Sequence, residues 1–269
     1  MSMDEKIIAN VFDLFITTKC TMNCKKCCAY IPFVQNSRHT PKEIVFREIK
    51  EFFHVFDYAN RIEFIGGEPM MHPELTAIVE ESVKYKEQYG FMRITTNCTI
   101  VPNDDFLRYI HDCGVYFDFV LDDYGVHSRA YPAVAEKLDA FGIPYKVYHY
   151  HGDEQYFNGW IDFGDHSDKN YTEQELIHVF SHCTAAVKNT FFATYDGKVH
   201  PCLYSLAGQY TGRLAPKPGE WIDLFDDAMT YEKKREIANN FLKAPFNACR
   251  YCNGFLSDSA ERIQAAVQL

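Results

Sequence analysis

The chain has 269 residues, of which 47% are hydrophobic and 24% are charged, a composition typical of a globular protein. This length allows one large domain, or a large and a small one. Lys and Arg number 27 and Asp and Glu number 37, so the formal net charge is -10. Nucleic-acid binding needs a cationic face, and the longest basic cluster is EKKRE at 232–236, so DNA and RNA are excluded as expected substrates.

The start of the chain carries no recognisable targeting signal. Residues 1–15 lack the charged head, apolar middle and small-residue cleavage site of a signal peptide, and no apolar run approaches membrane-spanning length. We therefore expect a cytoplasmic protein without a membrane partner. Thiols stay reduced in the cytoplasm, so the ten cysteines are interpreted as metal ligands or reactive groups rather than as disulfides.

Strand and helix patterns alternate along the first 150 residues. Apolar runs of strand character are followed by amphipathic helical patterns, which predicts parallel pairing through right-handed crossovers and therefore an open or closed β/α barrel. The expected strands are 11–18, 61–69, 91–97, 115–123 and 144–150, and the expected helices are 40–56, 72–90 and 104–114. In such barrels the chemistry lies on the loops that follow the strands.

The helix expected over 40–56 shows the clearest local pattern. Thr40 is expected as its N-cap, Pro41 as its first helical residue, and Glu43 as the residue that completes a capping box. Five apolar residues then form one face, which predicts a helix packed against the sheet. They are Val45, Ile49, Phe52, Phe53 and Phe56.

The alternation stops after about residue 155. Residues 159–170 are loop-like, 172–183 predict a connecting helix, and 190–202 predict a β-hairpin that turns at Asp196 and Gly197. We expect a barrel domain over residues 1–170 and a small extension of a hairpin and a helix over 171–269. An extension this short lacks an ordinary hydrophobic core, which favours stabilisation by a metal group.

The stretch TTKCTMNCKKCC at 17–28 follows the first expected strand and holds Cys20, Cys24 and Cys27 on one loop. Structural zinc sites usually have four ligands in two close pairs, and this spacing does not supply them. Three thiolates instead suit three irons of a 4Fe-4S cube whose fourth iron stays open for a non-protein ligand. Cys28 is expected to pack behind the cluster.

This spacing resembles the Cys-x3-Cys-x2-Cys signature of the radical S-adenosylmethionine (radical SAM) superfamily. Two further segments match the family: Gly66-Gly67-Glu68-Pro69 after the second strand, and ITTN at 94–97 after the third. The resemblance implies a partial TIM-like barrel, AdoMet bound to the open iron, and a 5'-deoxyadenosyl radical made on reduction. Lys26 departs from the family, where an aromatic residue often packs beside adenine. The residues expected around AdoMet are Gly66, Gly67, Glu68, Pro69, Thr96, Asn97 and Asp122.

Cys183, Cys202, Cys249 and Cys252 lie in the tail. Thirteen residues separate Cys183 from Gly197, and four separate Gly197 from Cys202, which resembles the start of the SPASM/twitch extension of many radical SAM enzymes. No cysteine follows Cys252, so the shorter twitch form with one auxiliary 4Fe-4S cluster is the better match. Tetrahedral zinc on the same four thiolates is the alternative, and the upstream barrel favours iron and sulfur.

Several remaining residues are candidates for the reaction itself. Cys98 could return a hydrogen atom to a substrate radical, or it could simply fill space in the core. Asp122, Asp123 and Tyr124 end an expected strand at the catalytic face, where Asp123 could act as a base or these residues could cap a helix. Trp160, Asp162 and Asp165 are expected at the mouth of the same site, and Cys113 in the core.

The sequence thus predicts a radical SAM enzyme that takes hydrogen from a C-H bond of a sugar, aminocyclitol or similar small substrate. Loss of an electron would make it a dehydrogenase, and return of hydrogen by Cys98 an epimerase. A peptide maturase is the runner-up, disfavoured because the chain lacks room for a leader-binding domain. A zinc-stabilised binding module is a remote alternative. Flavodoxin or ferredoxin is the expected electron donor.

Overall fold

The computed structural model describes residues 6–154, 160, 162, 164–183, 185, 191–241, 243–254 and 262–269. The strands are β1 (Ile8–Thr17), β2 (Tyr58–Gly66), β3 (Tyr89–Thr96), β4 (Phe117–Asp123), β5 (Tyr145–His149), β6 (Phe191–Tyr195), β7 (Lys198–His200) and β8 (Ile222–Asp223). The helices are α1 (Lys42–Val55), α2 (Leu75–Val83), α3 (Asp104–Asp112), α4 (Tyr131–Ala140), α5 (Glu173–Ser181), α7 (Leu203–Tyr210) and α8 (Tyr231–Asn240). Short 3-10 turns lie at Ile31–Phe33, Pro69–Met71, Gly125–His127, Gly152–Glu154 and Asn247–Arg250.

The described strands form one eight-stranded sheet in the order β5-β4-β3-β2-β1-β6-β7-β8. The strands from β5 to β6 pair in parallel, and β7 and β8 are added antiparallel. The sheet is not closed, because β5 and β8 are its two edges. The prediction of a partial TIM-like α/β fold is therefore confirmed.

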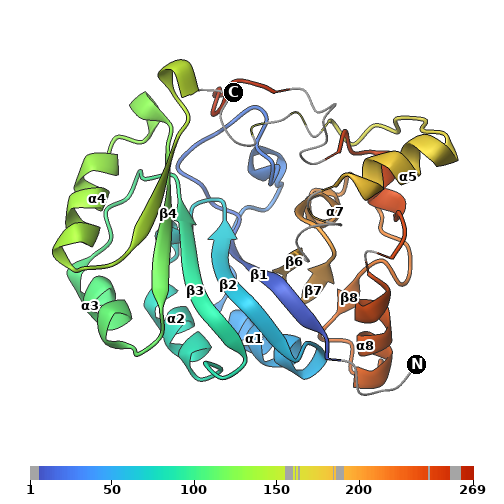
Figure 1. Ribbon diagram of the computed structural model, residues 1–269, viewed down its shortest axis with the longest axis horizontal. Helices are drawn as coiled ribbons and strands as arrows, with labels where there is room; N and C mark the ends of the chain where they lie inside the picture. Colours follow the sequence, from blue (N-terminus) through green and yellow to red (C-terminus); the bar gives the residue numbers. More distant parts are fainter. Residues whose placement is uncertain are drawn as a thin grey trace.

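The hydrophobic core lies between the sheet and helices α1 to α4, which follow its outer, convex side (Figure 1). The face predicted for α1 is buried, and the Phe52 ring stacks on Phe12 of β1 at 3.7 Å and on Phe56 at 4.3 Å between centroids. Stacked aromatic pairs bury large areas, so this contact fixes α1 on the sheet. No helix in the described ranges is both long and apolar enough to cross a membrane.

The capping box predicted at Thr40 is wrong. Helix α1 begins at Lys42 with Pro41 as its N-cap. Thr40 is held in an extended segment beside β1, where its backbone N-H donates to the Ile16 carbonyl at 2.9 Å. Its buried hydroxyl has no hydrogen-bond partner among the described residues. Pairing with β1 therefore places the start of the helix one residue later than the local pattern suggests.

The predicted hairpin is present, and it extends the barrel sheet. β6 and β7 turn at Asp196 and Gly197, whose φ angles of 56° and 79° suit a two-residue hairpin turn. β6 also pairs in parallel with β1, with Leu14 opposite Thr194. The Gly197 N-H donates to the buried Glu48 carboxyl of α1 at 2.7 Å, so the turn is anchored to the barrel.

Glu48 should make the stability of the protein depend on pH. Burial raises the pKa of its carboxyl to about 8. The folded state therefore keeps a proton that the unfolded chain releases near pH 4.5, so this stabilisation is complete below pH 4.5 and is lost as pH rises towards 8. Glu48→Gln should remove a slope of up to about 1.4 kcal/mol per pH unit in this window, measured by urea unfolding. Glu236→Gln, at an exposed position, should keep the slope; an unchanged slope in Glu48→Gln would contradict the assignment.

Candidate functional site

The three cysteines of the first cluster lie together on the loop that follows β1. Cys24 is buried, and Cys20 and Cys27 are partly exposed. Burial raises the pKa of the Cys20 thiol to about 12, and negative charge on Glu68, Cys27 and Cys24 adds to the shift. Burial likewise raises the pKa of Cys24 to about 11, with a contribution from Cys27. The three thiols are thus close enough to interact, and a bound cation is what would favour their deprotonated forms.

The Gly-Gly-Glu-Pro segment docks its backbone directly onto this loop. The Gly67 N-H donates to the Thr17 carbonyl and the Glu68 N-H donates to the Lys19 carbonyl, both at 2.9 Å. A Cβ added at Gly66 would lie 2.1 Å from the Thr17 oxygen, and one at Gly67 would lie 2.2 Å from the Lys19 oxygen. Only glycine permits this approach, so the two glycines position the cysteine loop.

Glu68 connects the same segment to the end of β3. Its carboxyl accepts from the Met70 N-H at 3.0 Å, the Thr96 hydroxyl at 2.8 Å and the Asn97 N-H at 2.8 Å. The side chain is fully buried, and burial raises its pKa to about 7 although these donors oppose the shift. Glu68 therefore holds two loops together with its carboxyl, and Pro69 begins the short turn that follows.

Two amide side chains reach the sulfur atoms of the first cluster. Asn97 Nδ2 lies 3.6 Å from Cys20 Sγ, and Gln268 Nε2 lies 3.3 Å from Cys24 Sγ. N-H groups that point at cysteine sulfur are among the features that tune iron–sulfur clusters. Gln268 also accepts from the Asn23 N-H at 2.7 Å, so the end of the chain packs along the cysteine loop (Figure 1). Sequence reasoning missed Gln268, since no local pattern marks a contact over 244 residues.

The four tail cysteines also come together. Cys202 is the N-cap of α7 and its sulfur accepts from the Ser205 N-H at 3.4 Å, while the Cys252 sulfur accepts from the Gly254 N-H at 3.3 Å. Burial raises the pKa of Cys249 to about 12, and charge on Cys252 and Cys183 contributes. Cys202 and Cys252 show raised pKa values as well, from burial first and then from charge on other members of the group.

The inner face of β2 to β4 is lined mainly by charged and polar side chains, whereas Phe15 of β1 and Ala193 and Tyr195 of β6 belong to an apolar cluster on the same face. Residues of a strand alternate between faces, and those opposite the hydrophobic core on β1 to β4 include Asp13, Arg61, Glu63, Arg93, Thr95, Asp118 and Asp122. Arg61 pairs with Glu63 at 2.7 Å and Arg93 with Asp118 at 2.5 Å. Parallel sheets are usually apolar on both faces, so this face has the character of a binding surface.

Asp122 and Tyr124 stand at the end of this inner face. The Tyr124 hydroxyl donates to Asp122 Oδ2 at 3.1 Å, and the Tyr124 ring stacks on Tyr150 and meets Trp160 edge-on. Burial raises the pKa of Asp122 to about 7, with further contributions from Glu63 and Glu68. Asp123 is the next residue of the strand, so it points to the opposite face, where it meets His149 and His151.

The thiols of Cys98 and Cys28 lie in different surroundings. Cys98 is fully buried in the hydrophobic core, and its backbone has a left-handed φ of 57°. Cys28 was expected to pack behind the cluster, but it is exposed. Its thiol interacts electrostatically with Asp122, Tyr124 and Tyr150, which places it toward the inner site. The Tyr30 N-H donates to the Cys27 carbonyl at 2.9 Å, so the chain turns directly after Cys27.

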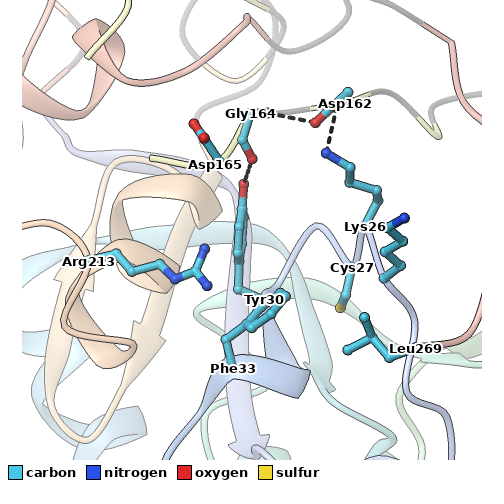
Figure 2. Close-up of a pocket in the computed structure, with 10 residues that line it drawn as sticks. Lys26, Cys27, Tyr30, Phe33, Asp162, Gly164, Asp165, Arg213 and Leu269 are labelled. Carbon is cyan, nitrogen blue, oxygen red and sulfur yellow. Dashed lines mark hydrogen bonds and ion pairs between the residues drawn. The ribbon is translucent and has the colours of Figure 1, made fainter. Parts of the chain in front are cut away.

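A cavity of about 240 Å³ lies beside Cys27, between the cysteine loop and the segments that follow the barrel (Figure 2). Lys26 spans its mouth and pairs with Asp162 at 2.8 Å, while the Tyr30 hydroxyl donates to the Gly164 carbonyl (Figure 2). Asp165 and Arg213 also line it. Lys26, which departs from the family pattern, thus forms an ion pair where related sequences carry an aromatic ring.

Residues 14–125 match the family model described as the Radical SAM superfamily. Among solved structures, BtrN in complex with AdoMet and 2-DOIA aligns with a TM-score of 0.63 and 15% identity, over 98% of this chain and 100% of that chain. A polyhistidine-tagged form of anSMEcpe with bound AdoMet has a TM-score of 0.55 and 14% identity, over 97% and 93% of the two chains. Native anSMEcpe with bound AdoMet and Kp18Cys peptide gives 0.52 and 11%, over 95% and 93%. No curated protein matches the sequence.

At these identities the structural likeness shows a shared fold. Residues 14–125 are thus similar in sequence to the radical SAM superfamily, and the chain shares its fold with solved structures that bind AdoMet.

Gly67→Ala should disrupt the first cysteine loop. The added Cβ would lie 2.2 Å from the Lys19 carbonyl oxygen and 2.9 Å from the Cys20 Cβ, and neither atom is the far end of a flexible side chain. We expect anaerobically reconstituted Gly67→Ala to lose most of the iron of the first loop, measured as iron per chain. Gly142→Ala is a control for backbone strain without a clash, since its φ is 65° and nothing lies within 4 Å of its Cβ. Equal iron contents in the two variants would show that the contact does not control the loop.

Proposed function

We propose that this protein removes a hydrogen atom from a C-H bond of a small polar substrate such as a sugar or an aminocyclitol, and oxidises it. Cys20, Cys24 and Cys27 would hold a 4Fe-4S cluster, and its open iron would bind AdoMet. When bound, this pair supplies the 5'-deoxyadenosyl radical that takes the hydrogen atom. The observation that carries the choice of substrate is the charged inner face of the sheet.

The residues proposed around AdoMet lie at or just after the carboxyl ends of β2, β3 and β4, and they are Gly66, Gly67, Glu68, Pro69, Thr96, Asn97 and Asp122. The Glu68 carboxyl is already occupied by three donors of the protein. Its role is therefore to shape the loops, and the ammonium group of AdoMet would be left to backbone carbonyls, which are good acceptors.

The charged inner face favours a substrate with several hydroxyl or amino groups. Buried charges are costly unless they are paired, and here the arginines and acids pair with one another along the face. A polar substrate can form hydrogen bonds with such a surface. An apolar substrate would displace water from the charged side chains of the protein and offer them no hydrogen bonds. BtrN, the structural neighbour bound to 2-DOIA, supports a small-molecule substrate, whereas anSMEcpe with a peptide supports the peptide-maturase alternative.

Asp122 is the carboxylate proposed to accept a proton from the substrate radical, with Tyr124 as its hydrogen-bonding partner. Asp122 faces the inner site, and its pKa of about 7 suits a general base that works near neutral pH. We assign this role to Asp122 rather than to Asp123, because Asp123 lies on the other face of β4.

The electron released in this oxidation would pass to a second 4Fe-4S cluster held by Cys183, Cys202, Cys249 and Cys252. Four protein ligands leave no open iron, which suits a conduit for electrons. The substrate then loses one hydrogen atom to the radical, one proton to Asp122 and one electron to this cluster. Reduction of the first cluster would come from an external donor such as flavodoxin or ferredoxin.

Epimerisation is the second candidate, and the electrostatic interaction of the Cys28 thiol with Asp122 and Tyr124 supports it. A thiol that faces Asp122 and Tyr124 could return a hydrogen atom to the substrate radical, whereas the thiol of Cys98 is enclosed by the core. Cys28 therefore replaces Cys98 as the hydrogen donor in this alternative.

Anaerobic reconstitution followed by a substrate panel tests the proposal. We expect about eight irons per chain, as two 4Fe-4S clusters require, and 5'-deoxyadenosine release with dithionite and AdoMet. Sugars and aminocyclitols deuterated at ring carbons should transfer deuterium to 5'-deoxyadenosine, measured by mass spectrometry. Deuterium transfer only from peptides would overturn the substrate class, and zinc in place of iron on the cysteines, without AdoMet cleavage, would overturn the enzyme.

The two thiols can be separated in deuterium oxide with an accepted substrate. If the product is an epimer, Cys28→Ala should abolish incorporation of solvent deuterium while AdoMet cleavage continues. Cys98→Ala should retain incorporation, because its thiol is buried away from the inner face. An oxidised product in both variants supports the dehydrogenase, and loss of incorporation only in Cys98→Ala would refute the assignment to Cys28.

A further inference from the structure

Three potential metal ligands meet at the carboxyl ends of β4 and β5. They lie on the outer face of the sheet, opposite to the face that carries Asp122. Asp123 is the last residue of β4, His149 is the last residue of β5, and the two are directly paired in the sheet. His151 follows two residues later. The ligand atoms of these three side chains all lie within 4.8 Å of one another. Sequence reasoning did not foresee the group, because Asp123 and the histidines are 26 and 28 residues apart.

The Asp123 carboxylate is the buried member of the group, and the two imidazole rings are its exposed members. Asp123 Oδ2 is 2.8 Å from both His149 Nδ1 and His151 Nε2, and Oδ1 accepts from the Gly125 N-H at 2.9 Å. The Asp123 side chain is 7% exposed, whereas the His149 and His151 side chains are 43% and 49% exposed. An ion could therefore enter from solvent and meet a carboxylate whose second oxygen is already fixed.

Packing holds both imidazole rings in place. The His149 ring meets Tyr131 edge-on at 5.8 Å, and the two histidine rings meet at 5.6 Å with their planes nearly perpendicular. A Cβ added at Gly125 would lie 3.1 Å from the His151 Cβ, so the chain passes closely behind this ring. Ligands positioned in this way lose little freedom when an ion binds, which favours affinity.

Two imidazoles and one carboxylate are typical ligands of divalent transition metals. Neighbouring ligands on one ion with bonds of about 2.0 to 2.1 Å lie roughly 3 Å apart, close to the distances found here. Magnesium and calcium prefer oxygen ligands alone, and soft ions prefer thiolates, so the mixed set favours zinc and similar borderline ions.

We propose that Asp123, His149 and His151 bind one divalent transition metal ion, with Zn²⁺ as the expected occupant in solution, and that its remaining coordination positions face solvent. The ion would join the loops that follow β4 and β5. Asp122 lies on the opposite face of the same strand, so this site does not depend on the proposed reaction. Without an ion the three side chains form a hydrogen-bonded group, which is the alternative that the test must separate.

The test uses the anaerobic protein with its clusters loaded, dialysed against buffered Zn²⁺ and analysed for zinc and iron per chain. We expect one zinc per chain without loss of iron. His149→Gln/His151→Gln should lose this zinc. The matched control is His178→Gln/His182→Gln, which removes two exposed histidines of one helix end whose rings lie 4.2 Å apart. This control should still bind one zinc.

X-ray absorption at the zinc edge gives a second readout that needs no variant. Zinc at this site should show only nitrogen and oxygen neighbours at about 2.0 to 2.1 Å. A sulfur shell near 2.3 Å would place the zinc on cysteines and overturn the proposal. Failure to bind zinc, or zinc lost in the control but kept in the His149/His151 variant, would overturn it as well.

Discussion

The site depends on one close contact between two stretches of backbone. Gly66 and Gly67, at the end of β2, lie against the Thr17 and Lys19 carbonyls, where any side chain would collide. This contact fixes the start of the cysteine loop relative to the sheet. Glu68 then extends the arrangement to β3 through Thr96 and Asn97, and Asn97 reaches back to Cys20. Three consecutive strand ends are thus joined by hydrogen bonds before any cofactor is considered.

The alternation of side chains along parallel strands gives the sheet two different faces. The outer face is apolar and packs against α1 to α4, whereas the inner face carries paired arginines and acids. At the end of β4 this alternation sends Asp122 inward and Asp123 outward. One strand end therefore contributes to the proposed reaction through its first aspartate and to the proposed zinc site through its second.

The sequence predicts those features of the fold and the site that depend on local patterns of residues. The β/α alternation, the hairpin turn at Asp196 and Gly197, and the radical SAM motifs are all short-range features. Helix α4 was not expected, and the cap of α1 was misplaced because pairing of Thr40 with Ile16 overrides the capping preference. Gln268, and the meeting of Asp123 with His149 and His151, depend on contacts distant in sequence. Cys28 and Cys98 have different surroundings because the direction of the chain and the degree of burial differ at the two positions. The local sequence pattern reveals neither.

Cys20, Cys24 and Cys27 are proposed to hold a cluster whose open iron binds AdoMet. Low-temperature electron paramagnetic resonance of the dithionite-reduced protein tests it most directly, recorded before and after AdoMet is added. We expect one 4Fe-4S signal whose g values shift with AdoMet and which is absent from Cys24→Ala, whereas a signal from the cluster proposed on the tail cysteines should be the same in both comparisons. If no signal responds to AdoMet, or if the responding signal persists in Cys24→Ala, these three cysteines do not hold the cluster that binds AdoMet.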